Sequence, residues 1–180
     1  MDPDLAAQLV AVLLGATAVA SIAGWATYGR SIWPPIALVL LAATAVMAAV
    51  PDQIDMGDRR LATLVVALAG LTAVAGGGPV TTWVFAFVDR GEAVADSMEE
   101  AGTVLRGGAW IGGLERLAVF AGLAATFPEG VAVVLALKGV GRFPELRGGT
   151  GGTTERFIIG TFTSVLWAAG AAGVVALTLR

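Results

Sequence analysis

The sequence predicts an all-α fold: a polytopic bundle of about six transmembrane helices, forming a single integral membrane domain over residues 1–180. Apolar residues make up 57% of the chain, and the mean hydropathy is +0.82. Charged residues make up only 14%, against about 25% in an ordinary soluble domain. Because one helical crossing takes about 20 residues, the chain holds about six crossings and leaves no room for a soluble domain of ordinary size.

The composition also excludes several classes of function. The chain has no Cys and no His, which excludes disulfides, thiol nucleophiles, imidazole or thiolate metal sites and a Ser-His-Asp relay. The net charge is −3 and the sequence contains no run of Lys or Arg, which argues against a nucleic-acid partner. We therefore expect no bound metal, no cofactor and no nucleic acid, and we assign no catalytic residue.

The first predicted span covers residues 5–27. Asp2 and Pro3 suit the N-cap and the first turn of a helix. The apolar run that follows is long enough to cross a bilayer at about 1.5 Å per residue. No basic segment precedes the run, and it is longer than the apolar segment of a signal peptide. We therefore expect a retained transmembrane helix.

The second predicted span covers residues 36–50. Pro34 and Pro35 suit the first turn of this helix, because the backbone amides there have no partner within the helix. Pro51 marks its end, since proline cannot continue a helix without losing a hydrogen bond.

The third predicted span covers residues 61–76, with Asp58 as a plausible cap. The sequence Gly-Gly-Gly-Pro at residues 76–79 predicts a break in this helix. Residues 80–88 are apolar but too few to cross alone, so we interpret them as a half-helix or an interfacial extension. A discontinuous helix of the kind found in transporters is the alternative.

An amphipathic helix is predicted over residues 92–105, on the cytoplasmic side and outside the bilayer core. Apolar residues recur there at helical spacing, at Val94, Met98, Ala101 and Leu105. Acidic residues occupy the other faces, at Glu92, Asp96, Glu99 and Glu100. Such a face is usually solvated, and docking of a partner protein at residues 92–100 is the alternative.

The last three predicted spans cover residues 109–127, 129–143 and 157–179. Pro128 marks a tight turn, so the fourth and fifth spans should form a hairpin. Residues 144–154 are rich in Gly and Thr and predict a loop before the sixth span.

Small residues repeat at four-residue spacing on several predicted helices, for example at Ala7, Ala11 and Gly15. Such stripes let helices approach closely, and we interpret them as packing within the bundle. A homo-oligomer interface is the alternative.

The distribution of Lys and Arg predicts the orientation in the membrane. With both termini outside, the inner side holds Arg30, Arg90, Arg106, Lys138, Arg142, Arg147 and Arg156. The outer side then holds Arg59, Arg60 and Arg180. Because cytoplasmic loops carry the excess of positive charge, we expect both termini outside.

Three charged residues of the predicted hairpin should meet at one depth. At helical rise, Glu115 lies about 18 Å before Phe127, while Lys138 and Arg142 lie about 14 Å and about 20 Å after Glu129. Lys138 and Arg142 are four residues apart and share one face, on which a carboxylate could bridge both cations. Small residues on the face of Glu115 direct it toward a neighbouring helix rather than toward lipid.

The candidate binding site extends this cluster. It consists of Glu115, Arg116, Lys138, Arg142, Glu145 and Arg156. One interpretation is a structural ion-pair network, in which Arg116 and Arg142 extend to water at the membrane interface. The other is a functional site for a small ion or for an anionic headgroup of a lipid.

The last 75 or so residues contain three motifs: IGGLER at residues 111–116, Lys138 followed by RFPEL at 142–146, and IIGT at 158–161 with Ser164. In their order and spacing these motifs resemble a family of bacterial multi-spanning membrane proteins known only as a domain of unknown function. Gly113 departs from the pattern, because the family tends to have a bulkier residue there. The resemblance implies that Glu115, Arg116, Lys138, Arg142 and Glu145 belong together, and that the chain lies in the bacterial cytoplasmic membrane.

These observations favour a non-enzymatic membrane protein: a small transport module, or a subunit of a membrane complex, with a charged site on its cytoplasmic side. Two alternatives stay open. One is an intramembrane enzyme that acts on a lipid phosphate, with Glu115 as acid or base. The other is a structural subunit that docks a partner protein through its acidic helix.

Overall fold

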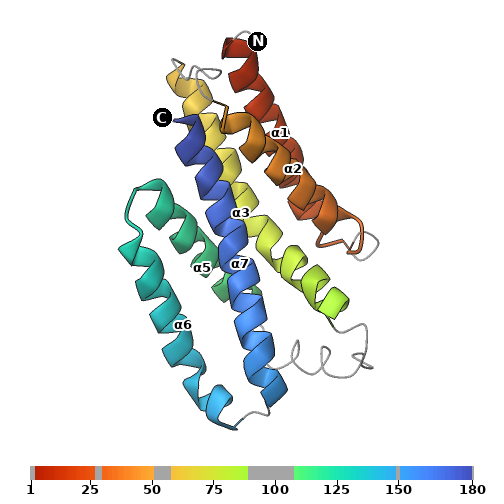
Figure 1. Ribbon diagram of the computed structural model, residues 1–180, viewed down its shortest axis with the longest axis vertical. Helices are drawn as coiled ribbons and strands as arrows, with labels where there is room; N and C mark the ends of the chain where they lie inside the picture. Colours follow the sequence, from red (N-terminus) through yellow and green to blue (C-terminus); the bar gives the residue numbers. More distant parts are fainter. Residues whose placement is uncertain (1–2, 27–29, 51–57, 89–107, 149–150, 180) are drawn as a thin grey trace.

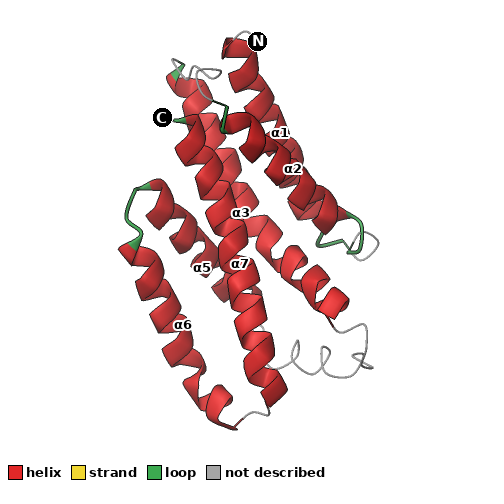
Figure 2. Cartoon of the chain, viewed as in Figure 1, coloured by secondary structure: helices red, strands yellow, loops and turns green. Residues whose placement is uncertain are grey.

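The computed structural model describes residues 3–26, 30–50, 58–88, 108–148 and 151–179. This part of the chain consists of helices joined by turns and contains no strand, as Figure 2 shows, so the all-α prediction is confirmed. The helices are α1 Pro3–Ala23, α2 Trp33–Ala48, α3 Arg59–Val88, α5 Gly108–Ala124, α6 Glu129–Gly148 and α7 Gly151–Thr178.

The helices α3 and α7 pack along each other at the centre of the bundle (Figure 1). α1 packs on α3 and on α2, and α2 also contacts α7. α5 lies against α7 and α3, whereas α6 packs mainly on α5 and stands at the edge of the bundle. Successive helices run in opposite directions, so the start of α1 and the end of α7 lie at the same end of the molecule (Figure 1).

Within the described part, three helices are long and apolar enough to cross a membrane: Asp4–Ala23, Arg59–Val88 and Gly152–Thr178. α2 is apolar but has only 16 residues. α5 has 17 residues, and α6 has 20 residues and carries several charges. The fold is therefore that of a helical membrane bundle, and the crossing of α2, α5 and α6 stays a prediction.

Small side chains fill much of the core. Ala69 and Ala73 of α3 and Ala168 of α7 are fully buried, and larger residues such as Leu14 pack around them. Lipid tails are as apolar as the helix surfaces, so helix association in a membrane depends on van der Waals contact. Small residues increase this contact because they let the helices approach closely. For these residues the packing interpretation of the small-residue stripes is confirmed.

The predicted break at residues 76–79 is wrong: α3 continues through Pro79 to Val88. Pro79 has no amide proton, so the carbonyl oxygen of Ala75 loses its partner within the helix. The indole Nε1 of Trp25, just after α1, donates to this oxygen over 2.8 Å and replaces the missing bond. Residues 80–88 are therefore the last turns of one helix and not a separate half-helix.

The glycines before Pro79 make room for side chains from neighbouring elements. A Cβ on Gly78 would lie 2.7 Å from the Trp25 ring, and one on Gly76 would overlap the ring of Trp167. Trp167, which is 3% exposed, donates its indole N–H to the carbonyl oxygen of Thr72 over 2.9 Å. The glycines of this continuous helix thus leave space in which side chains from neighbouring segments pack.

Other helix ends agree with the sequence in part. The Oδ1 of Asp58 accepts the backbone N–H of Arg60 at 2.8 Å, which confirms the predicted cap. Prolines at the start of α2 confirm the beginning predicted there.

The loop predicted over residues 144–154 is wrong, because α6 runs to Gly148 and α7 begins at Gly151. Extending an existing helix needs no new nucleation, so it outweighs a propensity cost of up to about 1 kcal/mol per glycine. The amphipathic helix predicted over residues 92–105 lies outside the described residues, and so does its proposed docking face at residues 92–100.

Candidate functional site

A tight turn sets the register between α5 and α6. Thr126 adopts a positive φ of 56°, and the backbone N–H of Phe127 donates to the carbonyl oxygen of Gly122 over 2.7 Å. This is the left-handed ending common to helix C-termini. The chain then re-enters a helix at Glu129. The predicted hairpin is therefore confirmed.

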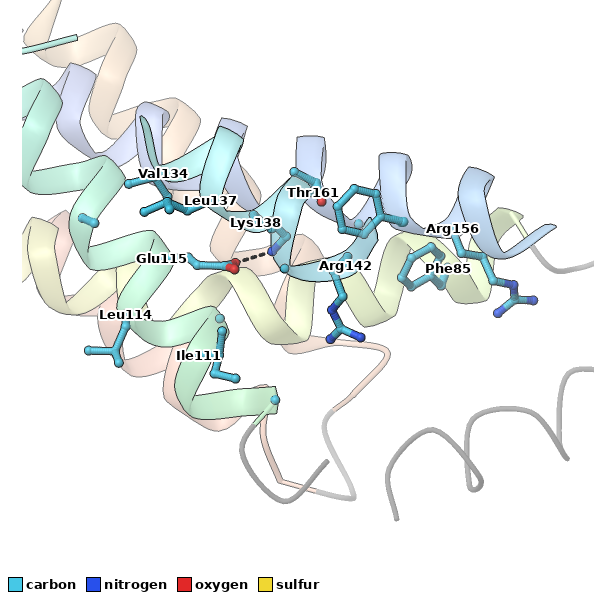
Figure 3. A pocket seen from close by; sticks show the side chains of 16 residues that line it. Phe85, Ile111, Leu114, Glu115, Val134, Leu137, Lys138, Arg142, Arg156 and Thr161 are labelled. Carbon is cyan, nitrogen blue, oxygen red and sulfur yellow. Dashed lines mark hydrogen bonds and ion pairs between the residues drawn. The ribbon is translucent and has the colours of Figure 1, made fainter. Parts of the chain in front are cut away.

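In this register Glu115 of α5 faces Lys138 of α6. Their side chains form an ion pair and a hydrogen bond between Oε2 of Glu115 and Nζ of Lys138 (Figure 3). The two side chains are 20% and 21% exposed. A charge among apolar helices is costly unless it is paired. The predicted contact between these two residues is confirmed.

The ion pair stands in the wall of a partly open pocket of about 670 Å³ between α5, α6, α7 and the end of α3. This volume lies within the range of about 300–1,000 Å³ that is usual for ligand sites. α6 lines it with positions at the spacing of one helix face, namely Val134, Leu137, Lys138, Gly141 and Arg142. Phe85 reaches the pocket because α3 does not break at Pro79.

Positive charge gathers at one end of the pocket. Figure 3 shows Val134 and Leu137 at one end, the ion pair in the middle, and Arg142 and Arg156 toward the other end. The guanidinium of Arg156 lies over the Phe85 ring, 6.0 Å from its centre. Among the described residues that line the pocket, Lys138 and these two arginines are the cations, and Glu115 is the carboxylate.

A hydroxyl group in the same wall lacks a partner. The Oγ1 of Thr161 in α7 is buried and makes no hydrogen bond within the described part of the chain. Thr161 lines the pocket between its two ends (Figure 3). A buried polar atom without a partner costs free energy. The oxygen itself has almost no accessible surface, so it lies behind the surface of the pocket.

Arg116 lies elsewhere, although it follows Glu115 directly. Neighbouring residues on a helix point about 100° apart, so Arg116 enters the core between α5, α3 and α7. It is 6% exposed, and its Nε donates to the carbonyl oxygen of Val74 over 2.9 Å. Its Nη1 lies 3.5 Å from the hydroxyl of Ser164. The expectation that Arg116 extends to water is wrong.

Gly77 completes the seat of Arg116, because a Cβ there would overlap the arginine Cδ. Arg116 lines a second, smaller cavity of about 210 Å³ together with Ser164, Thr81 and Lys138. Arg116 therefore joins three helices beside the first pocket without lining it, and Lys138 lines both cavities. Glu145 lies in α6, but its side chain is outside the described residues.

Sequence reasoning missed several lining residues. The sequence predicts that Phe85 lies in a separate half-helix, and it gives no sign that Thr161 lines a pocket. The pocket-lining residues of α6 between Val134 and Arg142 are three or four positions apart, which is the spacing of one helix face. The sequence shows this spacing, but a face that contacts lipid would have the same spacing. In the described part of the chain, no group of three or more acidic residues is placed so that it could hold a metal ion.

The chain matches no family model, no curated protein and no solved structure. The resemblance of its last 75 or so residues to a domain of unknown function therefore stays a prediction.

Proposed function

We propose that the protein is a non-enzymatic integral membrane module, either a small transport unit or a subunit of a membrane complex, that receives a phosphate-type anion in the pocket between α5, α6 and α7. The observation that carries this proposal is that three cations, Lys138, Arg142 and Arg156, line one otherwise apolar pocket whose carboxylate, Glu115, is paired with Lys138.

The arginines give the pocket its selectivity for anions. A guanidinium presents paired N–H donors that fit the oxygens of a phosphate, and its charge persists at every physiological pH. Lys138 adds a third cation while Glu115 holds it in the wall. An anion that reaches Lys138 would compete with Glu115 for its ammonium group, so the ion pair can give way to bound ligand.

The proposal places the chain in a bacterial cytoplasmic membrane with both termini outside. Arg142 and Arg156 then face the cytoplasmic side, where positive charge is retained. Two observations support this orientation. Lys and Arg are distributed unevenly between the two sides, and the start of α1 and the end of α7 lie at the same end of the bundle (Figure 1).

Binding of inorganic phosphate and of glycerol 3-phosphate to the detergent-solubilised protein tests the proposal. We expect both anions to raise the unfolding temperature, and the double variant Arg142→Gln/Arg156→Gln to remove the effect. Arg147→Gln is the matched control, because Arg147 also lies on α6 and over a ring, that of Phe143 at 4.8 Å, but does not line the pocket. Equal effects of all these variants, or no anion effect in the wild type, would overturn the proposal.

A further inference from the structure

We infer that the pocket takes a phosphate-headed lipid, with the phosphate at Arg142 and Arg156 and the start of an acyl chain between α5 and α6 toward the hairpin turn. This inference rests on the proposed function and names the source of its anion. The two possible sources, a free phosphate compound and a lipid, share the same headgroup chemistry and differ in what they need from the rest of the pocket.

Phe85 lies beside Arg156 at the cationic end of the pocket, whereas the end at Val134 and Leu137 holds no charge, and this uneven distribution of charge points to an amphiphile. On α6 the lining face begins at Val134 and ends at Arg142, about 12 Å further at helical rise. On the antiparallel α5, Ala118 lies at the apolar end. A free anion needs only the cationic end, so apolar walls of this length would serve no purpose for it.

The side of the pocket that the α5–α6 hairpin forms is also open. Ile111, Leu114 and Leu137 line the pocket and yet are 53%, 65% and 68% exposed. They belong to the outer, apolar face of the α5–α6 hairpin, which in a membrane contacts acyl chains. A lipid can therefore enter laterally from the bilayer without its chain crossing water.

The middle of the pocket offers contacts for the polar linkage between phosphate and chain. The Lys138 ammonium, paired with Glu115, lies between the cationic and the apolar ends (Figure 3). Ester oxygens accept hydrogen bonds from an ammonium group. The order of cations, donors and apolar surface along the pocket is thus the order of phosphate, linkage and chain in a lipid.

Two ligands with one headgroup test the inference: dioleoyl phosphatidic acid and glycerol 3-phosphate. Their binding is measured by native mass spectrometry and thermal unfolding of the full chain in detergent. Ala118→Phe fills the apolar end and leaves the cations in place. Its matched control is Ala121→Phe, which changes another exposed alanine of α5 that does not line the pocket.

We expect Ala118→Phe to weaken binding of phosphatidic acid about tenfold, since exclusion of about two methylene groups has that effect. Binding of glycerol 3-phosphate should stay unchanged, and Ala121→Phe should change neither. Val134→Phe against Val133→Phe repeats the comparison on α6, where only Val134 lines the pocket. This second pair decides the question if the first variant fails to fold.

The outcomes separate the inference from the proposed function. If Ala118→Phe and Val134→Phe leave phosphatidic acid binding intact while Arg142→Gln/Arg156→Gln abolishes binding of both ligands, the pocket takes a headgroup only and the inference fails. If phosphatidic acid binds equally well to every variant, it is bound as surrounding lipid and the inference fails. If no anion binding depends on the two arginines, the proposed function fails as well.

Discussion

The indole nitrogen of Trp25 donates a hydrogen bond to the carbonyl oxygen of Ala75 over 2.8 Å. Ala75 is the residue whose carbonyl Pro79 deprives of its partner, four positions later in α3. Pro79 in α3 therefore leaves a carbonyl oxygen without its helical donor, and Trp25, just after α1, supplies a donor in its place. The contact lets α3 continue far enough for Phe85 to line the pocket.

Removal of the indole donor should destabilise the bundle. Trp25→Phe keeps a ring at this position and loses the hydrogen bond, so we expect the free energy of unfolding to fall by about 1 kcal/mol. In a Pro79→Ala background the backbone N–H of residue 79 can donate to Ala75, and the loss should be less than half as large. Reversible unfolding in detergent measures both. Trp110→Phe, at a residue that is 79% exposed, is the control and should have little effect.

Equal losses from Trp25→Phe in the wild type and in the Pro79→Ala background would contradict this account. They would mean that the indole N–H of Trp25 and the carbonyl freed by Pro79 do not interact, since the effects of independent sites are additive.

Gly77 should tolerate no larger side chain while Arg116 occupies its seat. A methyl group at residue 77 overlaps the Cδ of Arg116, whose Nε is held by the Val74 carbonyl. We expect Gly77→Ala to lower the free energy of unfolding by about 1–3 kcal/mol, as overpacking does. Gly173→Ala in α7, where a Cβ would meet nothing within 4 Å, should be neutral or stabilising by up to about 1 kcal/mol.

Removal of Arg116 distinguishes overpacking from a general cost of the methyl group. In an Arg116→Ala background the overlapping atoms are gone, so Gly77→Ala should become neutral or favourable. A loss of the same size in both backgrounds would show that Arg116 does not fill this space.

The sequence predicts the site best where the geometry is local. Helical rise and a tight turn place Glu115 opposite Lys138 without knowledge of other helices, and the ion pair confirms this. The direction of Arg116 depends on where α3 and α7 lie, which no spacing within α5 reveals. An exposed or a buried arginine fits the same local pattern.

The fold shows the same division. Propensity alone makes Gly-Gly-Gly-Pro a helix breaker, and it fails at residues 76–79 because Trp25, Arg116 and Trp167 fill the space and satisfy the backbone. These partners are far away in the chain: Arg116 is 39 positions from Gly77, Trp25 is 53 from Gly78, and Trp167 is 91 from Gly76. Composition and periodicity do not reveal contacts between residues so far apart in the chain, so they could not predict that α3 is continuous.

The membrane topology can be measured directly, because the chain has no native Cys. Single cysteines at Leu179, at Phe127 and at Ile32 report the end of α7, the hairpin turn and the start of α2. If all six helices cross, Leu179→Cys and Phe127→Cys react with a membrane-impermeant thiol reagent from outside, and Ile32→Cys reacts only after permeabilisation. Reaction of Phe127→Cys only after permeabilisation, with Leu179→Cys still reactive from outside, would show that the hairpin does not cross. Reaction of Ile32→Cys from outside, with Leu179→Cys and Phe127→Cys protected, would reverse the proposed orientation.

Loss of either partner should reveal the energetics of the Glu115–Lys138 pair. Lys138→Met leaves the carboxylate of Glu115 without its partner, and removal of one partner from a buried pair costs about 3–5 kcal/mol. Since both side chains are about one fifth exposed, we expect the lower end of that range. Glu115→Gln should cost less, because the longer lysine side chain can extend toward the interface.

The double variant Glu115→Gln/Lys138→Met leaves no unpaired charge at this position, so it should be more stable than Lys138→Met alone. Unfolding of all four proteins in detergent completes a double-mutant cycle, and we expect a coupling of at least about 1 kcal/mol. Fully additive losses would show that the two side chains do not stabilise each other. In that case Lys138 would be held in the pocket wall by other groups, and an incoming anion would not have to displace Glu115 to reach it.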